Sequence, residues 1–103
     1  MRTLNKEAAE RMPKLYSTDG QKQREVQVVF KHISSRWCWM IVEGEQQEDG
    51  DWLLYGYVES GLGEDCDEWG YVMLSELMAI PEIMQFTYKK NPIIDNNGEI
   101  VSA

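Results

Sequence analysis

The hydrophobic pattern along the chain changes its period once, and the change separates a helical start from a β-rich body. Leu4, Ala8 and Met12 repeat every four residues, which predicts a short amphipathic helix that ends at Pro13. From Val26 onward, apolar and polar residues alternate with the period of two that is typical of a half-buried strand. We therefore expect one helix followed by a sheet.

Five segments of the body have the composition of strands. Residues 37–42 are apolar on both faces, which indicates a central strand. The acidic segment from Glu43 to Asp51 predicts a solvated hairpin loop, and residues 74–80 predict a second short helix that ends at Pro81. Because the connections are short, the strands should form an antiparallel meander. The predicted strands are residues 26–31, 37–42, 52–58, 68–73 and 83–88.

These elements predict a single α+β domain. We expect the N-terminal helix to pack on a curved antiparallel sheet of four or five strands, with the second short helix following. A chain of 103 residues has room for one modest core. We expect the domain to span residues 1–92 and the polar tail, residues 93–103, to fray.

Apolar runs and cysteines both bear on the compartment. No apolar run approaches the roughly 20 residues that a membrane-spanning helix needs. The first residues lack the apolar stretch of a secretory signal, so we expect a cytoplasmic protein. Cys38 lies in an apolar strand and Cys66 in a polar loop, which predicts two free thiols.

Charge is distributed very unevenly along the chain. Between Arg36 and Lys89 there is no Lys, Arg or His, yet this stretch carries twelve carboxylates. The residues up to Arg36 have a net charge of +4, and the whole chain has a net charge of −8. A protein with this distribution should repel nucleic acid over most of its surface and attract basic protein surfaces.

No pattern in the sequence indicates catalysis. The carboxylates lie in loops rich in Gly and Gln, where water keeps them ionised, so a general acid–base pair is disfavoured. His32 is the only candidate base for a nucleophilic cysteine, and its position in a polar turn favours an ordinary surface role. The acidic loops lack the ligand spacing of an EF-hand. We expect a non-enzymatic protein without a cofactor or a dedicated metal site.

Three motifs follow one another along the chain: a Pro-Lys-Leu-Tyr-Ser-Thr-Asp-Gly-Gln stretch at residues 13–21, Trp-Cys-Trp at 37–39 and Leu-Ser-Glu-Leu at 74–77. Together they resemble a family of small prokaryotic proteins of unknown function that are carried on plasmids, phages and integrative elements. The resemblance extends from about residue 4 to residue 92. It implies a mobile-element setting and no particular reaction.

The acidic loops carry the main functional hypothesis. A rigid acidic surface can occupy a phosphate-binding groove by presenting carboxylates where phosphates would lie. In a mobile-element setting, this predicts an anti-defence protein, such as an anti-CRISPR or antirestriction inhibitor. It would bind a basic, nucleic-acid-handling host protein by nucleic-acid mimicry. The predicted contact residues are Glu48, Asp49, Asp51, Glu64, Asp65, Asp67 and Glu68.

Two alternatives stay open. The acidic loops are also compatible with a solvated surface that only keeps the protein soluble. In the second alternative, a plasmid or phage accessory factor binds nucleic acid weakly through a basic patch on the first helix, formed by Arg2, Lys6, Arg11 and Lys14. The aromatic strands should be mainly core, although one or two Trp in excess of the core would mark a contact surface.

Overall fold

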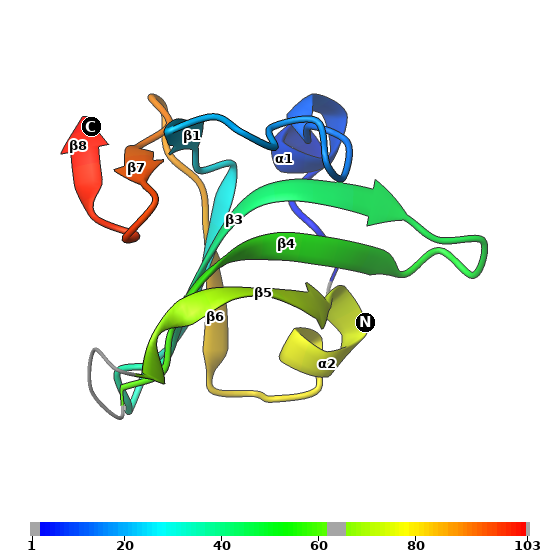
Figure 1. Ribbon diagram of the computed structural model, residues 1–103. Coiled ribbons are helices and arrows are strands. Elements are labelled where there is room, and N and C mark those ends of the chain that lie inside the picture. Colours follow the sequence, from blue (N-terminus) through cyan, green and yellow to red (C-terminus); the bar gives the residue numbers. More distant parts are fainter. Residues whose placement is uncertain (1–2, 62–65, 103) are drawn as a thin grey trace.

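A five-stranded antiparallel sheet forms the centre of the molecule (Figure 1). The computed structural model describes residues 3–61 and 66–102. The order of the strands in the large sheet is β5-β4-β3-β2-β6. These strands are β2 (Val28–His32), β3 (Cys38–Gln46), β4 (Trp52–Glu59), β5 (Glu68–Met73) and β6 (Ile83–Phe86).

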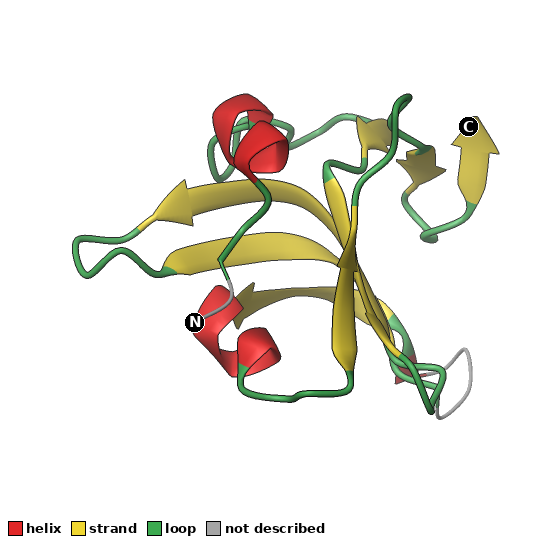
Figure 2. Cartoon of the chain, turned by 180° about the vertical axis from the view of Figure 1, so that it is seen from behind, coloured by secondary structure: helices red, strands yellow, loops and turns green. Residues whose placement is uncertain are grey.

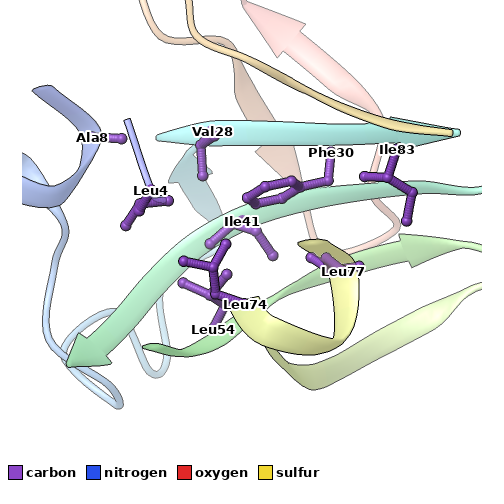
Figure 3. Close-up of a cluster of buried hydrophobic side chains, with 9 residues drawn as sticks. All are labelled: Leu4, Ala8, Val28, Phe30, Ile41, Leu54, Leu74, Leu77 and Ile83. Atoms are coloured by element: carbon purple, nitrogen blue, oxygen red, sulfur yellow. The ribbon is translucent and has the colours of Figure 1, made fainter. Parts of the chain in front are cut away.

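Two short helices cover one face of the large sheet (Figure 2). In α1 (Lys6–Arg11), the side chain of Asn5 caps the first turn by accepting a hydrogen bond from Ala8 N at 3.2 Å. In α2 (Leu74–Met78), the Glu76 carboxylate accepts a hydrogen bond from Met73 N at 3.0 Å. Both helices contribute to one buried cluster (Figure 3), which consists of Leu4, Ala8, Val28, Phe30, Ile41, Leu54, Leu74, Leu77 and Ile83.

A second core lies on the opposite face of the large sheet, because successive residues of a strand point to opposite sides. Phe30 belongs to the first cluster, whereas its neighbour Val29 belongs to the second. A small three-stranded sheet covers part of this face through Ile94, which is completely buried. Its strands, in the order β1-β7-β8, are β1 (Gln23–Glu25), β7 (Ile93–Asp95) and β8 (Ile100–Ser102).

The predicted fold class is confirmed: this is an α+β domain with a five-stranded antiparallel sheet. As predicted, β3 lies at the centre of that sheet, and Cys38 and Cys66 are free thiols. No helix within residues 3–61 and 66–102 is long and apolar enough to cross a membrane.

The structure differs from three local predictions. The strands do not form a simple meander, because β6 pairs with β2 and not with β5. The segment predicted as a polar tail contains two strands, since β7 pairs with β1 and β8 pairs with β7. Glu43 does not belong to a solvated loop: it lies within β3 with only 1% of its surface exposed. All three differences arise from contacts with segments that are distant in the sequence.

Candidate functional site

The two predicted acidic loops lie at opposite ends of β4. Gln46 pairs with Trp52 beside the first loop, and Cys38 pairs with Glu59 next to the second. At about 3.3 Å per residue, the length of β4 separates these ends by roughly 25 Å. The β3–β4 hairpin projects from one end of the sheet (Figure 1). A single compact contact therefore uses one loop and not both.

The turn of the β3–β4 hairpin is held by its own hydrogen bonds. Gly50 N donates to the carbonyl oxygen of Gln47 at 3.0 Å, and Gln47 N donates to that of Asp51 at 2.7 Å. Asp51 N in turn donates to Asp49 Oδ1 at 3.0 Å. Glu48 and Asp49 are both exposed. The turn therefore presents two predicted contact carboxylates to solvent on an ordered backbone.

Asp51 has a structural role in this hairpin. Its carboxylate accepts hydrogen bonds from the hydroxyl of Ser75, from Ser75 N at 3.0 Å and from Trp52 N at 2.8 Å. The hydrogen bond from the Ser75 hydroxyl is the main reason why the pKa of Asp51 is lowered. Asp51 thus ties the hairpin to the first turn of α2, and its oxygens are already engaged.

In the second acidic loop, one of the predicted contact carboxylates has a structural role. Asp67 Oδ1 accepts a hydrogen bond at 2.9 Å from Ser60 N, so this carboxylate closes the loop. Glu68 is exposed on β5, whereas Glu64 and Asp65 lie outside the described residues. A basic residue lies against the loop as well: a Cβ atom added at Gly61 would come within 2.9 Å of Arg36 Cβ. The segment between Arg36 and Lys89 contains no basic residue, but in the folded protein Arg36 lies against its second acidic loop.

One residue of the predicted basic patch, Lys6, lies close to the first acidic loop. Lys6 and Arg11 of α1 are exposed, as is Lys14, while Arg2 lies outside the described residues. Lys6 lines a groove of about 940 Å³, and Asp49 and Asp51 line the same groove. Carboxylates next to Lys6 oppose the approach of a phosphate backbone.

Glu43 is a structural residue of the site that sequence reasoning missed. Its Oε1 accepts a hydrogen bond from Tyr16 N at 2.8 Å, and its Oε2 accepts one from Thr18 N at 2.8 Å and another from the Thr18 hydroxyl. Arg24 Nε donates to Thr18 Oγ1 at 3.0 Å and brings a positive charge near the carboxylate. One feature of the sequence could have indicated this burial: Glu43 directly follows the apolar run of residues 37–42.

The segment that Glu43 holds carries an unusual tyrosine. Tyr16 has a φ of 71°, in the left-handed region, and 64% of its surface is exposed. Its side chain shares a hydrogen bond with Tyr71, which is 50% exposed, and this bond is the main reason why the pKa of Tyr71 is raised to about 12. The strand register agrees with this proximity, because Glu43, which binds Tyr16 N, pairs with Tyr55, and Tyr55 pairs with Tyr71.

Tyr71 is also the outer end of a row of aromatic side chains on β4 and β5, formed by Tyr55, Trp69 and Tyr71. The ring of Tyr55 packs 4.7 Å from that of Tyr71 and stacks on Trp69 at 5.6 Å, measured between centroids. The guanidinium of Arg24 lies 4.7 Å from the centroid of Trp69. Trp69 Nε1 donates to the carbonyl oxygen of Asn96 at 2.8 Å. The row is therefore packed at its Trp69 end and exposed at its Tyr71 end.

In the part of the chain that the structure describes, no group of three or more His, Cys, Asp or Glu residues is placed to hold a metal ion. Comparisons with family models, curated proteins and solved structures found no match for this chain. The resemblance to mobile-element proteins stays a prediction from the motifs. Any function has to be inferred from the chemistry of the residues themselves.

Proposed function

We propose that this protein is a non-enzymatic binding protein that recognises a basic partner through the acidic end of its large sheet. The acidic end consists of Glu45, Glu48 and Asp49 on the hairpin and Glu76 on α2. All four side chains are exposed. Their gathering at one end is the observation that carries the proposal.

The register of the strands explains why these residues gather. Glu45 pairs with Leu53, and Leu53 pairs with Met73, so the three residues form one row across the sheet. Glu76 joins this row through its hydrogen bond to Met73 N. Carboxylates from separate parts of the sequence thus lie at the same end of the large sheet.

The rigidity of this end favours binding. The turn is closed by backbone hydrogen bonds, and Asp51 attaches it to α2. A preorganised surface loses little conformational entropy when a partner docks on it. Complementary charge also raises the rate of association, especially at low salt. A rigid array of carboxylates is therefore suited to a surface that normally binds phosphates.

The partner that fits this chemistry is a basic host protein that handles nucleic acid. With the motif resemblance, the setting is a mobile element, and the effect is inhibition of host defence, as in anti-CRISPR or antirestriction proteins. Such a protein acts in the cytoplasm. Binding of nucleic acid through α1 is less well supported, because Lys6 lines the same groove as Asp49 and Asp51.

The test compares two triple variants with equal changes in net charge. The first neutralises the hairpin, as Glu45→Gln, Glu48→Gln and Asp49→Asn, and leaves Asp51 in place. The control carries Glu25→Gln, Glu82→Gln and Glu99→Gln, at exposed positions outside the hairpin, α1 and α2. The partner is captured from host lysate, identified by mass spectrometry and purified. Its affinity is then measured at two salt concentrations.

We expect the hairpin variant to bind the partner at least about tenfold more weakly at low salt. Each charge at the rim of an interface contributes modestly to the affinity, and this variant removes three of them. The control variant should bind like the parent. Equal weakening of both variants would mean that only net charge matters, and the acidic end would then serve solubility. Tight binding of duplex DNA by the parent would support the nucleic-acid alternative instead.

A further inference from the structure

Tyr16 and Tyr71 form an exposed surface that needs a separate explanation. Their exposed fractions are 64% and 50%, although aromatic rings are among the largest apolar groups of the chain. The fold places them side by side: Tyr16 N donates to Glu43, Glu43 pairs with Tyr55, and the ring of Tyr55 packs 4.7 Å from that of Tyr71. Rigid, exposed tyrosines provide a large contact area at a small entropic cost, which is why they are common in binding surfaces.

The backbone of Tyr16 indicates that this arrangement is enforced. A left-handed φ of 71° is unfavourable for a residue with a Cβ atom. The buried Glu43 carboxylate compensates for it by accepting hydrogen bonds from Tyr16 N and Thr18 N, both at 2.8 Å. Strained residues of this kind persist only where the surrounding structure holds them, and they are concentrated at functional sites.

The electrostatic environment of the two rings favours a cation. Asp19 is exposed, and its backbone N donates to the carbonyl oxygen of Tyr16 at 3.2 Å, so its carboxylate lies in the same turn as Tyr16. The hydrogen bond with Tyr16 is the largest cause of the raised pKa of Tyr71, and the charge of Asp19 contributes as well. The face of an aromatic ring also attracts cations. Within the same aromatic row, Arg24 already lies over Trp69. The exposed end of the row offers the same chemistry to a cation from outside.

We propose that Tyr16, Tyr71 and Asp19 form a binding site for an arginine side chain of the basic partner. Arginine suits this site better than lysine, because its planar guanidinium stacks on a ring and pairs with a carboxylate at the same time. The inference rests on the proposed function, since it assigns a specific contact to the same partner.

The position of the site agrees with a shared partner. Tyr71 pairs with Tyr55 in β4, whereas Met73 pairs with Leu53 in the row that leads to Glu45. The two rows are two residues apart on each strand, which corresponds to about 7 Å. An aromatic contact beside a polar rim is the usual organisation of a protein interface. The aromatic site and the acidic end thus form neighbouring parts of one surface.

The experiment is an NMR titration of the parent protein with the peptide acetyl-Gly-Arg-Gly-amide. The same peptide with citrulline, which has the shape of arginine without its charge, is the ligand control. We expect saturable shifts of the Tyr16, Asp19 and Tyr71 resonances with the arginine peptide and no saturable shifts with citrulline. Tyr71→Ala and Asp19→Asn should each weaken arginine binding at least about fivefold.

Matched variants elsewhere on the surface keep the test specific. Tyr88→Ala removes another exposed tyrosine, and Glu82→Gln another exposed carboxylate. Both should bind the arginine peptide like the parent. Equal shifts with arginine and citrulline, or unchanged binding by a well-folded Tyr71→Ala variant, would overturn the site.

Failure of the site is distinguishable from failure of the proposed function. If the hairpin variant loses affinity for the purified partner while Tyr71→Ala retains it, the acidic end binds and the arginine site is wrong. If the hairpin variant retains full affinity for the partner, the proposed function is wrong, regardless of the result of the peptide titration. A loss of partner affinity in both variants supports the whole surface.

Discussion

Replacing Glu43 with glutamine tests how the fold holds the segment around Tyr16. The glutamine side chain has the same shape as glutamate, so the packing inside β3 is preserved. One of its two terminal atoms, however, is an NH2 group that cannot accept a hydrogen bond. The backbone N–H groups of Tyr16 and Thr18 each require an acceptor at this position. One of them is therefore left unpaired in Glu43→Gln.

The magnitude follows from these contacts. A hydrogen bond to a charged group contributes about 1.5–3 kcal/mol, and a buried donor left without a partner costs about 1–3 kcal/mol. Glu43 is only 1% exposed, so water does not replace the lost acceptor. We expect the free energy of unfolding to fall by about 3 kcal/mol. For a domain of 103 residues, this lowers the melting temperature by roughly 12 °C.

Urea denaturation followed by tryptophan fluorescence gives the free energy of unfolding, and circular dichroism gives the melting temperature. The control is Glu45→Gln, an exposed residue of the same strand, which should change stability by less than about 0.5 kcal/mol. Release of the segment should also lower the pKa of Tyr71 from about 12 towards its ordinary value. A loss below about 1 kcal/mol, with the pKa of Tyr71 unchanged, would refute this explanation of Glu43.

Three further predictions concern other parts of the fold. Because the folded-state pKa of Asp51 is lowered, its stabilising effect should be present above its ordinary pKa of 3.8 and lost as the pH falls through the folded value. The melting temperatures of parent and Asp51→Asn should therefore differ at pH 6 and converge in strong acid. Burial raises the pKa of Cys38 to about 11, so a thiol reagent at pH 8 should label only Cys66 until the protein unfolds. Gly98→Ala places a Cβ atom 2.2 Å from a tyrosine ring at a φ of 75°, whereas Gly50→Ala meets open space at a φ of 90°. The loss of unfolding free energy should be about 1 kcal/mol for Gly50→Ala and at least 2 kcal/mol larger for Gly98→Ala, and comparable losses would contradict the close packing at Gly98.

The local pattern of residues was sufficient to predict most elements of the large sheet. Trp37 to Val42 is apolar at every position, and only a central strand with cores on both faces buries such a run. The short connections favour antiparallel pairing of neighbouring strands, which holds from β2 to β5, whereas β6 follows α2 and pairs with β2 at the other side of the sheet. These features depend on residues that are close in sequence, so periodicity and loop length reveal them without any knowledge of the whole fold.

The small sheet was not predictable in this way. Its pairing joins Arg24 to Ile94, two residues from opposite parts of the chain. Three-residue strands have too few positions for an alternating pattern to be recognised. The burial of Ile94 depends on where the second face of the large sheet lies, and the tertiary structure alone decides that.

The carboxylates of the candidate site show most clearly which properties the sequence determines and which properties only the tertiary structure determines. Composition determined the sign of the surface charge and the class of partner that this charge attracts. It could not separate Glu43, which is buried, or Asp51 and Asp67, which hold loops and a helix, from Glu48, which faces solvent. A carboxylate is chemically the same at each position. Its role depends on whether the N–H donors of a distant segment reach its oxygens, and only the folded chain brings those donors into place.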